Sequence, residues 1–188
     1  MLSSNTAIIT GLSAYLNIHP ASVKWLEMNI RFSYIYTYLP NSTDSTDHLP
    51  WIPAPHLHSE FRFKLNDGHS SIFRSTYFKI GIAKYWAQDN IYSALYTELA
   101  SVPYTLVDAG LGTDFVNSKT GRVICSLYVN CTNLSNISYA DHLNFAQYFY
   151  SQNGNLVTVT NQRQDVFNMG RDFSFKIVFP FELHRAPM

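Results

Sequence analysis

Apolar and polar residues alternate along most of this chain. The alternation is clearest from Trp25 to Leu39 and from Leu57 to Leu65, where almost every second side chain is apolar and most of those between are polar or charged. Successive side chains of a β-strand point to opposite faces, so this period predicts strands with one apolar and one polar face. The same pattern, less pure, predicts five more strands: Ile8–Ile18, Thr76–Trp86, Tyr104–Val116, Arg122–Leu134 and Gly170–Phe181.

The connections between these strands alternate in length. Short segments, in which Asp67-Gly68 and Lys119–Gly121 supply turn residues, alternate with the long segments Pro40–Pro55, Ala87–Pro103 and Ser135–Met169. Alternate connections of an antiparallel meander lie at opposite ends of the sheet, so the tight turns gather at one end and the long loops at the other. Outer-membrane barrels have this arrangement, together with an apolar outer band and a polar lumen.

The pattern therefore predicts an all-β fold, an antiparallel up-and-down meander of about seven strands that forms part of a transmembrane β-barrel. Seven strands are odd in number and too few to close a bacterial barrel of this type. On this interpretation the apolar side of each strand faces lipid, most plainly on the last strand. The lipid-facing residues that we expect are Phe32, Tyr34, Phe61, Phe63, Phe173, Phe175, Ile177, Phe179 and Phe181.

Aromatic residues are placed near the ends of the predicted strands. Tyrosine and tryptophan favour the headgroup level of a membrane, because the ring is apolar while the hydroxyl or indole N–H needs water. We expect an aromatic girdle formed by Trp25, Tyr34, Tyr36, Tyr38, Tyr85 and Trp86.

Composition limits the classes of function. The formal net charge is zero, so nothing attracts the chain to nucleic acid, and no such partner is expected. Charged residues make up 14% of the chain and aromatic residues 15%, which favours a β protein in contact with an apolar phase. No run of about 18 apolar residues is present, which excludes a transmembrane helix. Cys125 and Cys131 share one predicted strand and are too far apart for a disulfide.

Short motifs along nearly the whole chain resemble the last barrel strands of TonB-dependent outer-membrane receptors. Each motif is weak alone, but their order and spacing are those of the family. LPWIPAPH is similar to the family's "LP-x-IPP" strand entry, and PYTLVDAG to its "GYTLLNAG" strand. The motifs are Gly11–Ala14 with His19-Pro20, Phe32–Tyr34, Leu49–His56, Pro103–Gly110, Tyr128–Leu134, Tyr139 with Asp141–Leu143, and Gly170–Phe173.

The resemblance implies that residues 1–181 are the C-terminal barrel segment of such a receptor, without its plug domain and TonB box, and that residues 182–188 are an extension. A complete receptor would take up a scarce nutrient, such as a ferric siderophore or a cobalamin-like chelate, across the bacterial outer membrane. Its partners would be outer-membrane lipid, the barrel-assembly machinery, the small-molecule chelate and, in a full-length receptor, TonB. We expect this segment alone not to transport, and the residues after Phe181 to impair assembly.

No catalytic residue, enzyme activity or cofactor is expected from the sequence. His56 and His58 are candidate metal ligands, since a His-x-His pair on a strand can chelate zinc or copper, although a solvated lumen wall explains them more simply. The segments Asn41–His48 and Asn144–Arg163 are the expected ligand-facing loops. Two alternatives stay open, a soluble β-barrel or sandwich that binds an apolar ligand and a remnant with no function of its own.

Overall fold

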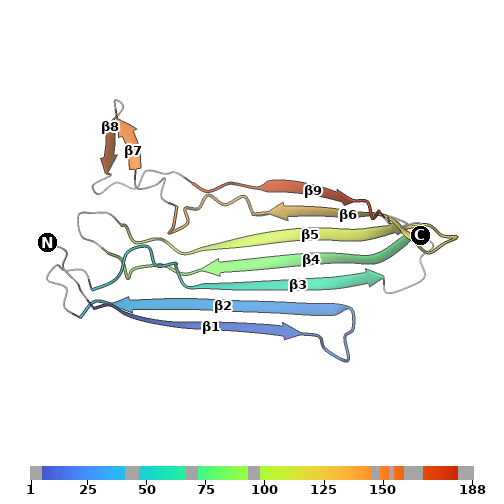
Figure 1. The fold of residues 1–188 in the computed structure, drawn as a ribbon, viewed down its shortest axis with the longest axis horizontal. Helices are drawn as coiled ribbons and strands as arrows, with labels where there is room; N and C mark the ends of the chain where they lie inside the picture. Colours follow the sequence, from blue (N-terminus) through green and yellow to red (C-terminus); the bar gives the residue numbers. More distant parts are fainter. Residues whose placement is uncertain are drawn as a thin grey trace, which may run out of the picture.

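The computed structural model describes residues 6–40, 47–66, 72–92, 98–144, 149–152, 155–158 and 167–181. These residues form nine strands and no helix (Figure 1). The strands are β1 (Ile8–Ile18), β2 (Leu26–Tyr38), β3 (His56–Asn66), β4 (Phe73–Tyr85), β5 (Tyr104–Val116), β6 (Val123–Thr132), β7 (Phe149–Gln152), β8 (Asn155–Thr158) and β9 (Asp172–Val178).

Seven of these strands form one antiparallel sheet in the order β1-β2-β3-β4-β5-β6-β9. The predicted all-β, up-and-down meander is therefore confirmed, and the long strands begin and end within a few residues of their predicted bounds. The prediction missed β7 and β8, which form a separate short hairpin inside the segment that was expected to be a loop.

Strand pairing places mainly apolar residues on one side of the sheet and mainly polar residues on the other. Phe61 of β3 lies between Met28 of β2 and Ile80 of β4, and Val129 of β6 likewise lies between two apolar residues. Glu60, one position away from Phe61, lies between Asn29 and Gly81 on the other side. The sheet thus has one mainly apolar face, interrupted by Lys84 between Leu57 and Thr105, and one mainly polar face.

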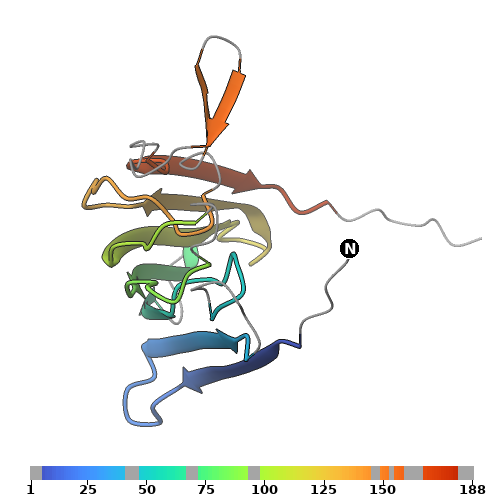
Figure 2. The same ribbon diagram turned by 90° about the vertical axis from the view of Figure 1, so that its left-hand side faces the viewer.

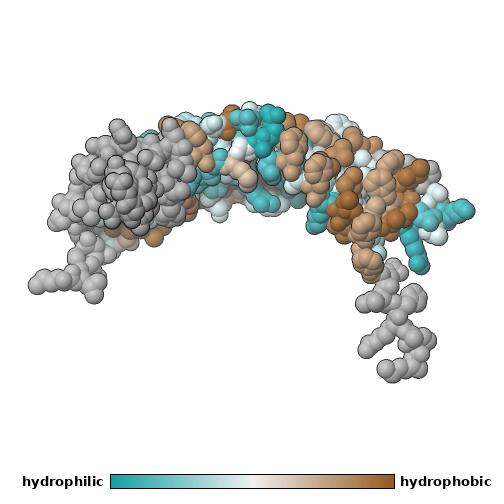
Figure 3. Space-filling model, turned by 90° about the horizontal axis from the view of Figure 1, so that it is seen from above, coloured by the Kyte–Doolittle hydropathy of each residue, from teal (hydrophilic) through white to brown (hydrophobic). Residues whose placement is uncertain are grey.

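The sheet is a single curved layer and is not closed. Figure 2 shows the strands stacked in one layer, and Figure 3 shows the sheet edge-on as an arch. Strands β1 and β9 form its two edges. Large apolar side chains stay exposed on the apolar face, such as Leu12 at 59% and Phe175 at 72%. The buried apolar side chains of the described residues are small: Ala54, Ala83, Val116 and Cys131.

The two ends of the sheet differ as the loop lengths predict. The turn between β5 and β6 and the segment between β1 and β2 lie at one end, and the long connections lie at the other (Figure 1). In the first turn, Gly121 has a φ of 68° and donates its N–H to the Asn117 carbonyl at 2.8 Å. This left-handed conformation explains why a glycine occupies the position.

Tryptophans contact the apolar face at both ends. Trp25 stacks on Phe63 near the turn end, with ring centroids 6.0 Å apart. Trp86 meets Phe32 edge-on near the loop end, at 6.1 Å. The prediction of an aromatic girdle is wrong for Tyr85. This residue pairs with His56 and Tyr104 and so belongs to the polar face.

Both cysteines lie on the apolar face of β6, as small apolar residues would. Cys125 pairs with Phe115, and Cys131 lies between Ala109 and Phe173. Both are free thiols, in agreement with the prediction that they form no disulfide.

Two glycines of β5 make room for long side chains on the polar face. A Cβ added to Gly112 would lie 2.5 Å from ring atoms of Tyr77, its partner on β4. A Cβ added to Gly110 would lie 2.7 Å from the Lys79 side chain. The Tyr77 ring that covers Gly112 also holds the Arg62 guanidinium, 4.4 Å from its centroid.

We predict that Gly112→Ala lowers the free energy of unfolding by about 1–2 kcal/mol, because the new methyl group displaces the Tyr77 ring. Gly81→Ala is the matched control, since its Cβ would meet Asp108 at an ordinary 3.5 Å. Urea unfolding followed by circular dichroism measures both variants. Equal stability of the two, or no relief of the Gly112→Ala effect when Tyr77 is also changed to Ser, would refute this packing.

Candidate functional site

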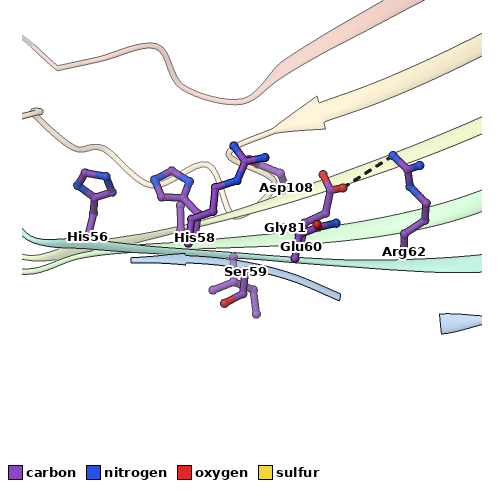
Figure 4. Close-up of a pocket in the computed structure, with 11 residues that line it drawn as sticks. His56, His58, Ser59, Glu60, Arg62, Gly81 and Asp108 are labelled. Carbon is purple, nitrogen blue, oxygen red and sulfur yellow. Dashed lines mark ion pairs between the residues drawn. The ribbon is translucent and has the colours of Figure 1, made fainter. Parts of the chain in front are cut away.

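A cavity of about 570 Å³ is hollowed in the polar face (Figure 4). Gly81 and Ala83 of β4 lie in its floor, beside Glu60 and His58 of β3, and their small size leaves the hollow between β3 and β5. His56, His58, Glu60 and Arg62 rise on one side of β3, whereas Ser59 points to the other. The residues that line the cavity are Asn29, Arg31, His56, His58, Ser59, Glu60, Arg62, Gly81, Ile82, Ala83 and Asp108.

A network of charges crosses β2, β3 and β4 next to this cavity. Glu27 lies 2.8 Å from the Lys64 Nζ, and Glu60 lies 3.2 Å from the Lys79 Nζ. Arg62 lies between the two carboxylates, 3.9 Å from Glu27 and 3.8 Å from Glu60. These charged side chains lie on the polar side of the sheet that the alternation predicts. Exposed ion pairs stabilise a fold only slightly, so the network mainly neutralises the face.

Four aromatic rings form a ladder across the strands where the polar face meets the long loops. His56 packs on Tyr85 with centroids 5.5 Å apart, Tyr85 stacks on Tyr104 at 4.6 Å, and Tyr104 packs on Tyr139 at 4.7 Å. His58 meets Tyr85 edge-on, and the Tyr85 hydroxyl lies 3.1 Å from its Nε2. The ladder therefore fixes the orientation of both histidine rings.

The candidate metal ligands lie together, as predicted. The rings of His56 and His58 are 5.3 Å apart on the same face. Each already uses one ring nitrogen, because His56 Nδ1 donates to the Ala54 carbonyl at 3.0 Å and His58 Nε2 is bonded to Tyr85. Over the described ranges, no cluster of three or more His, Cys, Asp or Glu side chains that could hold a metal ion is found. A metal at this pair stays a prediction.

Asp141 anchors the end of the aromatic ladder. Tyr104 donates its hydroxyl to the Asp141 carboxylate at 2.8 Å. Partial burial raises the pKa of the nearby Tyr139 phenol, and the negative charges of Asp141 and Asp108 raise it further. The raised pKa keeps the Tyr139 phenol protonated at neutral pH.

The most deeply buried side chains of the described residues lie at the loop end of the sheet, and most of them are polar. Glu98 and His142 are 2% and 1% exposed, and Glu98 Oε1 accepts a hydrogen bond from His142 Nε2 at 2.8 Å. The same carboxylate accepts from the backbone N–H of Trp51 at 2.9 Å and from that of Tyr92 at 2.6 Å. One carboxylate therefore joins all three long connections, and we call this group the loop hub.

Other buried polar side chains extend the loop hub. Gln88 donates to the carbonyls of Ile52 and Pro53 at 3.1 and 3.2 Å, and its backbone pairs with Ser101. Thr37, at the end of β2, accepts from the backbone N–H of Leu49 at 3.0 Å. The long connections thus have a packed polar base. The predicted ligand loops Asn41–His48 and Asn144–Arg163 lie mostly outside the described residues, as do residues 182–188.

Sequence reasoning did not identify the loop hub as a site. His142 was noted only within the DHL motif, and Glu98 only as part of a long loop. A glutamate in a connection gives no local signal that it will be buried beside a histidine 44 positions away. Glu98 meets its hydrogen-bond partners only when the long connections fold together at the loop end of the sheet.

The residues expected to face lipid all lie on the apolar side of the sheet or in the continuation of β9. Phe32, Phe61 and Phe63 are half-buried among neighbouring side chains of their own face. The others are exposed, and Phe181 is the most exposed at 89%. The remaining members of this exposed set are Tyr34, Phe173, Phe175, Ile177 and Phe179.

Comparison of the chain with protein-family models, with curated proteins and with solved structures finds no match. Nowhere in the described part of the chain is there a helix long and apolar enough to cross a bilayer. Any functional conclusion therefore rests on the sequence motifs and on the geometry of the sheet and its loops.

We predict that Glu98→Ala loosens the loop end while the sheet stays folded, because His142 and two backbone N–H groups lose a buried acceptor. Leaving a buried donor without its acceptor costs about 1–3 kcal/mol, and Glu98 serves three donors, so cleavage of the long connections by protease should quicken roughly a hundredfold. Limited proteolysis with mass spectrometry measures the rates at each connection.

Asp89→Asn is the control for this substitution, since Asp89 is exposed in the same connection. Unchanged proteolysis in Glu98→Ala, or the same change in Asp89→Asn, would show that the loop hub does not hold the connections.

Proposed function

We propose that this chain is a C-terminal barrel segment of a TonB-dependent outer-membrane receptor. The complete receptor would take up a scarce nutrient, such as a ferric siderophore or a cobalamin-like chelate, across the bacterial outer membrane. The segment supplies part of the barrel wall and does not transport alone. The motif resemblance to this family and the geometry of the sheet support the proposal independently.

One observation carries the proposal, the uncovered apolar face. In a soluble sandwich or barrel, such a face is buried against a second layer. The described strands form a single seven-stranded layer and a small separate hairpin, and Phe173, Phe175 and Ile177 are more than half exposed. Contact with lipid would remove this apolar surface from water, which lowers the free energy by roughly 25 cal/mol per Å².

Strand length supports the same interpretation. Strands of globular proteins are usually about five or six residues long. Strands β1 to β6 contain 10 to 13 residues each. A tilted strand needs about 9–11 residues to cross the hydrocarbon core of a bilayer. All six strands are therefore long enough to span it.

Strand direction indicates how the segment would fit a closed barrel. With seven antiparallel strands, β1 and β9 run in the same direction, so they cannot pair antiparallel with each other. A second copy rotated about the barrel axis would also bring β9 beside β1 in parallel. Closure as an all-antiparallel barrel needs an odd number of further strands, which a larger receptor barrel would supply.

The loop end fits the external mouth of such a receptor. Long external loops and short periplasmic turns are the rule in these barrels. Here the loop hub holds the three long connections together, which would present ligand-facing segments above an ordered base. The mixed charges of the polar face would line the lumen.

Fluorescence quenching by lipid tests the membrane assignment, because the three tryptophans occupy different places. Trp25 and Trp86 contact the apolar face at its two ends, and Trp51 lies in a long connection within the loop hub. We expect nitroxide labels near the headgroups of vesicles to quench variants that retain only Trp25 or only Trp86. Labels near the bilayer centre should quench these two variants less.

The variant that retains only Trp51 is the internal control and should stay unquenched. A chain that is monodisperse without detergent, and whose Trp25 and Trp86 are not quenched by lipid, would instead favour a soluble binder of an apolar ligand.

A further inference from the structure

The polar-face cavity contains two opposite charges that the protein itself does not neutralise. Arg31 of β2 and Asp108 of β5 both line it, and neither has an ion-pair partner among the described residues. The Arg31 guanidinium lies 5.5 Å from the centroid of the Tyr15 ring. Asp108 Oδ1 accepts the backbone N–H of Asn133 at 2.9 Å. The neighbouring Arg62 and Glu60, by contrast, belong to the charge network.

The cavity separates these two charges across the sheet. β2 and β5 are three interstrand spacings apart, about 14 Å along a flat sheet. The Arg31 guanidinium lies beside the Tyr15 ring of β1, the neighbour of β2 on the side away from β5. A solute that contacts both charges must therefore extend across the cavity.

Two histidines in the same cavity add fixed polar groups between these charges. His56 donates its Nδ1–H to the Ala54 carbonyl, which can only accept, so the lone pair of the neutral ring is on Nε2. His58 is held by Tyr85 through Nε2. In the part of the chain that the structure describes, His56 Nε2 and His58 Nδ1 bond to no protein group, so both can contact a ligand.

We propose that this cavity binds a small dipolar solute, with a carboxylate at one end and a protonated amine at the other. Arg31 binds the carboxylate with its planar pair of N–H donors. Asp108 accepts from the amine, and the histidines contact the middle of the solute. A simple anion would meet Asp108 and Glu60 in this cavity, and a simple cation would meet Arg31 and Arg62. The charge pattern therefore favours a molecule that carries both.

This site goes beyond the proposed receptor role and does not depend on it, because it lies on the polar face. The test uses the full chain in a nonionic detergent and isothermal titration calorimetry. The probes are ω-amino acids from glycine to ε-aminocaproate, each with the carboxylic acid and the amine of matching length. We expect at least one ω-amino acid to bind roughly tenfold more tightly than both of its one-ended analogues.

Two variants assign the ends of the bound solute. Arg31→Gln should remove the advantage over the matching amine, and Asp108→Asn, which keeps an oxygen for the Asn133 N–H, should remove the advantage over the matching acid. Arg74→Gln and Asp114→Asn are the controls. They make the same charge changes at a cross-strand pair near the turn end of the polar face and should leave binding unchanged.

Two results would overturn the site. One is that no ω-amino acid binds more tightly than both analogues, and the other is that the controls weaken binding as much as Arg31→Gln and Asp108→Asn. This test and the test of the receptor proposal can fail independently. Binding without lipid insertion contradicts only the receptor, and insertion without binding contradicts only this site.

Discussion

Strand register is the constraint on which the rest of this structure depends. Side chains alternate between faces, so a slip of one residue in any pairing would move a whole strand's apolar residues to the polar face. Along most of the length of all six pairings the observed register keeps apolar partners together, from Leu16 beside Ile30 to Val129 beside Phe175, and the register shifts of three pairings lie near the turn end. The two faces exist only because each strand fixes the register of the next.

The molecule divides its packing between two regions. Along the strands, the sheet has no interior, and cross-strand contacts such as Tyr77 over Gly112 stabilise it. At the loop end, buried polar groups replace an apolar core, with Glu98 and His142 almost fully buried. This distribution suits a wall between lipid and a polar interior, capped at one end by the loop hub.

The sequence was sufficient to predict the strands and their faces, because period-two alternation is a local signal. It fails where the backbone departs from regular pairing. β4 begins at Phe73, earlier than predicted, since Arg74 pairs with Asp114 and Tyr77 with Gly112, which leaves an extra residue on β4. Ser75, inside this bulge, has a φ of 53°. The bulge puts Phe73 and Tyr77 on opposite faces although alternation places them on the same one.

Sites formed by distant residues were harder to predict. The pairing of His56 with His58 follows from their spacing, but the aromatic ladder and the loop hub depend on which strands and loops become neighbours. Arg31 and Asp108 illustrate the same limit, because their common cavity requires the small residues Gly81 and Ala83 of a strand that lies between them.

The central claim is that one face of this sheet contacts lipid and the other contacts water. Spin labels placed one at a time at residues 172–178 of β9, with Cys125 and Cys131 changed to Ser, test it directly in vesicles. Collision with oxygen, which concentrates in lipid, should peak at 173, 175 and 177, and collision with a water-soluble nickel complex at 174 and 176. Equal access of the nickel complex to all these positions would contradict the account.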